Sequence, residues 1–150
     1  MISFTRAVIS GAEYNRLRAY CGWRSIPEAD VEDALRKSLV TFRVDSDGDL
    51  IGFARIIGDG IINIYIQDMI VHPDHRRRGI ANQLVSACLQ WASEEAPNAA
   101  IGLMAAKGVE PLYAQHGLIA RPNARMGAGM VMFPYMSESE LRDWSGDEVE

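Results

Sequence analysis

The stretch QDMIVHPDHRRRGIANQL, residues 67–84, contains the pattern that decides the fold. An apolar strand ending at Val71 is followed by a short turn, three arginines and Gly79, and then by apolar residues at helical spacing. A helix that begins at this point leaves several backbone N–H groups without intrahelical partners, and its peptide dipoles add partial positive charge. The stretch therefore predicts a strand, an anion-binding turn and a helix, in that order.

The composition of the whole chain limits its class. The 150 residues are 48% hydrophobic and 23% charged, values typical of one globular domain with its own core. We therefore predict a single domain over residues 1–150, with a C-terminal helix and acidic tail from about residue 137. The net charge of −5 argues against nucleic acid as a partner, because nucleic-acid binding usually needs a broad basic face.

Cysteines and apolar runs also exclude some classes. Cys21 and Cys88 are the two cysteines and form no CxxC motif, so we expect neither a disulfide framework nor a metal site. No apolar run approaches the roughly 20 residues that span a bilayer, so we expect no membrane partner. A cytoplasmic protein is the resulting prediction.

Hydrophobic periodicity predicts the order of the elements. A capping box at Ser10 and Glu13 predicts the start of the first helix, and Pro27 lies in the first turn of the second. The predicted strands are residues 2–8, 41–44, 50–57, 61–71, 101–105 and 129–133. The predicted helices are residues 11–20, 27–39, 79–91, 109–115 and 137–144.

Three short motifs resemble one protein family. Residues 76–81, RRRGIA, are similar to the [QR]-x-x-G-x-[GA] pyrophosphate loop of the GNAT superfamily of N-acetyltransferases, whereas GxxxxGK[ST] and GxGxxG are absent. The preceding YIQDMIVHPDH resembles the fourth strand of that superfamily. PLYAQHGL resembles its Tyr-x-x-x-Gly-Phe segment, with Tyr113 and Gly117 matched and Leu118 in the Phe position.

The resemblance implies a fold and a cofactor. The fold is α/β (α+β): a mixed, mostly antiparallel central sheet flanked by helices, whose fourth and fifth strands, residues 61–71 and 101–105, splay apart. Acetyl-CoA would bind in the gap between them. The residues implied to bind it are Ile70, Val71 and His72, through main-chain groups, and Arg76, Arg77, Arg78, Gly79, Ile80, Ala81 and Asn82, around the pyrophosphate. For at least one arginine, a solvated basic turn is the alternative.

The resemblance also implies the reaction: transfer of the acetyl group of acetyl-CoA to a primary amine, directly and within a ternary complex. Tyr113 would act as the general acid toward the CoA sulfur, unless it is an ordinary core aromatic. Asp68 is the candidate base, because burial in an apolar strand favours proton acceptance near neutrality. Its alternative role is to anchor a neighbouring loop, and His72, His116 or a chain of waters are alternative bases.

The acceptor is expected to be a small-molecule amine, with a peptide or protein amine as the alternative. Tyr14, Trp23 and Tyr65 are the candidate acceptor-binding residues, and packing in the core is their alternative role. The resemblance implies a homodimer. Ala106 stands where many family members have an asparagine, so the cofactor arm would lose one polar contact. The second hypothesis is a non-catalytic acyl-CoA-binding module, with the same loop but no productive acid and base.

Overall fold

The computed structural model describes residues 1–145 and divides the chain after Leu118 into two compact units. The first unit contains a five-stranded sheet with its strands in sequence order. Neighbouring strands are antiparallel except for the last two, which are parallel. The predicted mixed, mostly antiparallel sheet is confirmed, and its strands are β1 (Ile2–Thr5), β2 (Val40–Ser46), β3 (Asp49–Gly58), β4 (Asn63–Val71) and β5 (Ala100–Gly102).

The helices begin close to the predicted positions. The capping box is present: the Ser10 hydroxyl accepts from the Glu13 backbone N–H, and the Glu13 carboxylate accepts from the Ser10 N–H. The first unit contains α1 (Gly11–Tyr20), α2 (Glu28–Lys37), α3 (Ile80–Glu95) and α4 (Glu110–Ala114), with a 3₁₀ turn at Pro73–His75.

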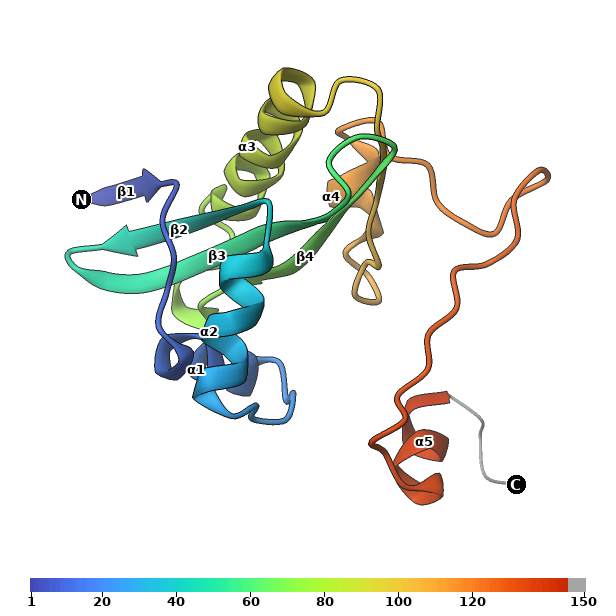
Figure 1. The fold of residues 1–150 in the computed structure, drawn as a ribbon, viewed down its shortest axis with the longest axis horizontal. Coiled ribbons are helices and arrows are strands. Elements are labelled where there is room, and N and C mark those ends of the chain that lie inside the picture. Colours follow the sequence, from blue (N-terminus) through green and yellow to red (C-terminus); the bar gives the residue numbers. More distant parts are fainter. Residues whose placement is uncertain (146–150) are drawn as a thin grey trace. The chain divides into compact units, whose positions relative to one another are not determined.

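Helix α3 lies on one face of the sheet, and α1 and α2 lie on the other (Figure 1). Two apolar clusters form the core, one with α3 and one with α1 and α2. The α3-side cluster includes Val44, Ile56, Ile64, Ile66, Leu84 and Cys88. The α1/α2-side cluster includes Tyr14, Leu17, Val31, Leu35, Phe53 and Ile70.

Strand β4 changes face at Asp68. Ile64 and Ile66 lie in the α3-side cluster, and strict alternation would place Asp68 and Ile70 there too. Instead, Ile70 packs in the α1/α2-side cluster while Met69 packs against the α3-side cluster. The cause is one extra residue in β4: Asp68 and Met69 together lie opposite Ala54, and Asp68 has a φ of 55°.

The turn between β3 and β4 depends on a glycine and an aspartate. Gly58 has a φ of 132°, and a Cβ there would lie 2.3 Å from the Asn63 carbonyl oxygen. The Asp59 carboxylate accepts from the N–H groups of residues 61, 62 and 63, which lowers its pKa. The turn therefore delays the start of β4 to Asn63, two residues after the predicted start.

The second unit begins at Ile119 and contains α5 (Glu138–Ser145). The predicted strand at Gly129–Phe133 is wrong: these residues form no strand, because apolar residues alone do not supply a neighbouring strand to pair with. Met130 and Met132 are 89% and 81% exposed. The predicted acidic tail beyond residue 145 lies outside the described residues. The prediction of one domain over residues 1–150 stays a prediction. Among the described helices, none has the length and apolar character needed to cross a membrane.

Candidate functional site

An open strand edge lies at the centre of the first unit. β4 and β5 pair only through Asn63 with Ala100, Ile64 with Ile101, and Tyr65 with Gly102. β5 ends at Gly102, whereas β4 continues to Val71. Beyond Tyr65, the edge of β4 that faces away from β3 therefore has no strand partner among residues 1–145.

Main-chain groups at the end of β4 face this open edge. The His72 N–H donates to the Ile51 carbonyl oxygen of β3 (2.7 Å), so it is already used inside the sheet. Alternate residues of a strand direct their N–H and C=O groups to opposite edges, which turns those of Val71 outward. There the Val71 carbonyl oxygen accepts from Arg76 Nε (3.3 Å). Of the three residues predicted to offer main-chain contacts, Val71 is the best placed.

The turn after β4 presents the N-terminus of α3. Arg77 and Gly79 have φ values of 60° and 79°, and Gly79 is the N-cap residue. No side chain caps this helix and no acidic residue lies in its first turn. A Cβ at Gly79 would meet no atom within 4 Å, so a ligand can approach the backbone closely. The turn therefore has the features of an anion-binding helix start.

Two of the three arginines of this turn contact neighbouring residues. Arg76 bonds the end of β4, as described above, and Arg78 Nη1 lies 3.0 Å from His75 Nδ1. Arg77 is exposed. Of the residues that follow, Ile80 is buried in the α3-side cluster, Ala81 is half-buried and Asn82 is exposed. Ile80 can therefore offer only its main chain to a ligand.

Tyr113 lies in α4, close to α3. His116 Nε2, just beyond α4, lies 3.0 Å from Asn82 Oδ1 in the first turn of α3, which ties the two helices together. Tyr113 is buried, and burial raises the pKa of its hydroxyl, with neighbouring Cys88 as a smaller cause. The hydroxyl therefore holds its proton at neutral pH.

Asp68 is the centre of a buried polar network. Its Oδ2 accepts from Arg55 Nε (2.6 Å) and from the Tyr14 hydroxyl (2.8 Å). Burial, together with the Asp68 carboxylate, raises the pKa of Tyr14 to about 12. The structure thus joins two residues that the sequence assigned to different roles, and adds Arg55, which the sequence analysis missed. A lone arginine in the apolar strand LIGFARII was the available signal.

The remaining aromatic candidates contact different neighbours. Trp23 packs against the α1/α2-side cluster beneath the Arg18 guanidinium, which is 5.4 Å from its ring centroid. Tyr65 is half-buried and packs against Gly102, where β4 and β5 separate.

The rings of Tyr20 and His72 meet at 4.5 Å between centroids, which places the end of α1 beside the end of β4.

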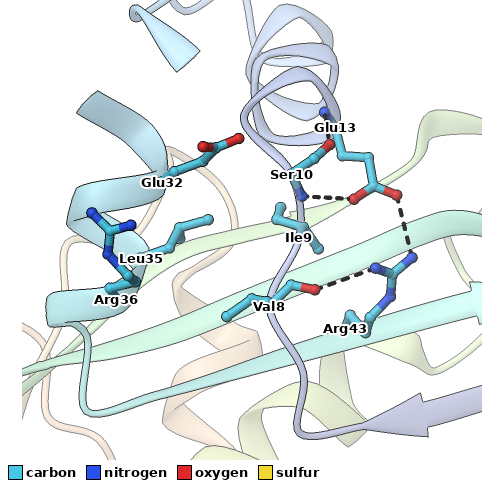
Figure 2. Close-up of a pocket in the computed structure, with 8 residues that line it drawn as sticks. All are labelled: Val8, Ile9, Ser10, Glu13, Glu32, Leu35, Arg36 and Arg43. Atoms are coloured by element: carbon cyan, nitrogen blue, oxygen red, sulfur yellow. Dashed lines mark hydrogen bonds and ion pairs between the residues drawn. The ribbon is translucent and has the colours of Figure 1, made fainter. Parts of the chain in front are cut away.

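A cavity of about 370 Å³ lies elsewhere, between the start of α1, α2 and β2 (Figure 2). Figure 2 shows that three of its polar residues make bonds within the fold: Ser10 and Glu13 form the capping box, and Arg43 bonds Glu13 and the Val8 carbonyl oxygen. The predicted site residues do not line it. No group of three or more His, Cys, Asp or Glu residues within the described 145 could hold a metal ion.

Comparisons with known proteins indicate one family. A family model described as an acetyltransferase (GNAT) domain matches residues 24–139. The chain is 29% identical to an uncharacterized N-acetyltransferase, ycf52, of Pyropia yezoensis over 119 residues, which cover 77% of this chain and 68% of that protein. The matched stretch spans 60–68% of the length of such relatives.

Two solved structures share the fold. A protein of unknown function and probable acetyltransferase from meticillin-resistant Staphylococcus aureus aligns with a TM-score of 0.79 at 20% identity, covering 89% of this chain and all of that chain. A predicted acetyltransferase from Clostridium acetobutylicum, crystallised with acetyl-CoA, aligns with a TM-score of 0.63 at 20% identity, covering 80% of this chain and 91% of that chain.

Proposed function

Because this chain belongs to the GNAT family of acetyltransferases, we propose that it transfers the acetyl group of acetyl-CoA to a primary amine. The observation that carries the proposal is the open edge of β4, which runs into an uncapped helix start at Gly79. Val71 would bond the pantetheine arm through its main chain. The N–H groups at the start of α3, with Arg76–Asn82 around them, would bind the diphosphate.

Tyr113 is the proposed general acid. The departing CoA thiolate needs a proton, and the raised pKa of Tyr113 keeps its hydroxyl protonated at neutral pH. The bond from nitrogen to the acetyl carbonyl carbon forms as the carbon–sulfur bond breaks, and the sulfur takes the tyrosine proton. Direct transfer in a ternary complex is supported by Cys88, whose thiol is buried with its pKa raised to about 12, so it is unsuited to carry the acetyl group.

Asp68 is the proposed proton acceptor for the amine. The two hydrogen bonds from Tyr14 and Arg55 are both accepted by Oδ2. The proton of the amine would therefore go to Oδ1, directly or through water. Tyr14, Trp23 and Tyr65 remain the residues proposed for the acceptor side. A small-molecule amine is the proposed acceptor, and a homodimer is the proposed assembly, supported by the exposed apolar run at residues 130–132.

The test combines binding with turnover. Calorimetry with CoA should give a saturable heat, and thiol release from acetyl-CoA should rise with one member of a panel of polyamines, amino sugars, aryl amines, amino acids and peptides. Tyr113→Phe should keep CoA affinity and reduce kcat by about a hundredfold or more. Unchanged turnover in Tyr113→Phe would remove the tyrosine from the mechanism.

A non-catalytic acyl-CoA-binding module is the second candidate: it would have the same open edge and helix start, but no productive acid and base. It predicts saturable CoA binding with no thiol release from any amine of the panel. The binding arm and the turnover arm of the same experiment therefore separate the two candidates.

A further inference from the structure

The extra residue of β4 adopts a conformation that needs support from its surroundings. At Asp68 the φ is 55°, which L side chains rarely adopt. An inserted residue of this kind also increases the twist of its strand and bends it. The insertion lies just past Tyr65, the last β4 residue that pairs with β5. The bend is therefore placed where the open edge begins.

Side chains from neighbouring elements hold this residue. Arg55 Nε from β3 and the Tyr14 hydroxyl from α1 both donate to Asp68 Oδ2, at 2.6 and 2.8 Å. The Asp68 and Arg55 side chains are only 3% and 15% exposed, so the ion pair is little screened by water. Arg55 Nη1 also donates to the Ser38 hydroxyl at the end of α2 (3.2 Å), which fixes the guanidinium from a third element.

We propose that Arg55 and Tyr14 are positioning residues for acetyl-CoA: through Asp68 they hold the bend of β4 and so aim the Val71 main chain at the pantetheine arm. The inference rests on the acetyl-CoA site of the proposed function. If Asp68 took ordinary extended backbone, the residues after it would slip by one, and the main chain of Val71 would turn toward β3. The network acts on the pantetheine part of the cofactor, because the diphosphate turn lies at the start of α3, which the buried Ile80 holds in the α3-side cluster.

The test therefore measures two ligands on the full chain. CoA contains the pantetheine arm, whereas 3′-phospho-ADP contains only the nucleotide part. Arg55→Lys keeps the charge but loses the Nε geometry, and Tyr14→Phe removes one hydroxyl. Arg43→Lys is the matched control. Arg43 lies in the neighbouring strand β2, its guanidinium donates to the Asp45 carboxylate at 2.7 and 2.8 Å, and its side chain is 20% exposed.

We expect Arg55→Lys and Tyr14→Phe to weaken CoA binding by about tenfold, while the Kd for 3′-phospho-ADP stays within about twofold. Arg43→Lys should change neither Kd. The proposal is overturned if folded Arg55→Lys and Tyr14→Phe bind CoA as the control does, or if both ligands weaken equally. If Arg55→Lys does not fold, Tyr14→Phe decides, because it keeps the ion pair. A wild-type protein that binds neither ligand would instead refute the proposed function.

Discussion

At the residue scale, breaking the Asp68 network should lower the free energy of unfolding more than breaking a surface ion pair does. A buried charge that loses its partner stays uncompensated, which typically costs about 3–5 kcal/mol. We therefore expect Arg55→Met to lower the free energy of unfolding by about 3 kcal/mol in urea denaturation. The Arg36 side chain is 71% exposed beside Asp33, and Arg36→Met should cost under about 1 kcal/mol. Equal losses in the two variants would contradict the buried role of Arg55.

Tyr14 gives the network a signature at alkaline pH. Its pKa is raised from 10.0 to about 12 in the folded chain, so the unfolded chain releases this proton first as the pH rises. The stability that Tyr14 contributes is therefore complete below pH 10 and is lost between about pH 10 and 12. The slope of this loss is at most about 1.4 kcal/mol per pH unit.

Tyr14→Phe should make the stability curve shallower over that pH range. Denaturation midpoints measured from pH 8 to 11.5 would check this. Cys88 and Tyr113, whose pKa values are also raised, remain in both proteins and cancel from the comparison. Parallel curves for wild type and variant would show that folding does not raise the pKa of Tyr14.

At the element scale, the start of α3 depends on the backbone of Gly79. An L side chain at its φ of 79° costs roughly 1–2 kcal/mol, and the turn would shift to relieve that strain. We expect Gly79→Ala to weaken CoA binding by about tenfold in calorimetry. Gly127→Ala is the control, because Gly127 has open space around it and lies outside the turn. A Gly79→Ala protein with wild-type affinity would argue against close backbone contact.

The elements whose signals are local were predictable from the sequence. Ser10 and Glu13 fix the start of α1 through their own reciprocal bonds, and the strand, turn and helix around Gly79 follow from adjacent residues. The face change of β4 was not predictable, because Ile64, Ile66 and Ile70 are spaced in the sequence as in a regular strand and give no sign of an insertion. Arg55 was missed for the same reason, since its partner is set by that insertion. Residues 129–133 have a strand-like composition, but composition does not identify a pairing partner.

At the scale of the whole molecule, a ligand that binds only the folded chain must stabilise it. CoA at one hundred times its Kd should add about 2.7 kcal/mol and raise the Tm by roughly 5–10 °C. Thermal denaturation with CoA, and with adenosine as the control, would measure this. No shift with CoA, or an equal shift with adenosine, would contradict the diphosphate site at the start of α3.

The extra residue in β4 also has a consequence for chain length. A protein with Asp68 deleted would keep Ile66, Met69 and Ile70 on their present sides of the sheet, since one residue would then lie opposite Ala54. Its apolar clusters would keep their members and its β4 would be straighter. β5 could then pair with more of β4 and cover the open edge. Apolar packing therefore does not require the extra residue, whereas the buried Arg55 and Tyr14 side chains would lose the partner that they share.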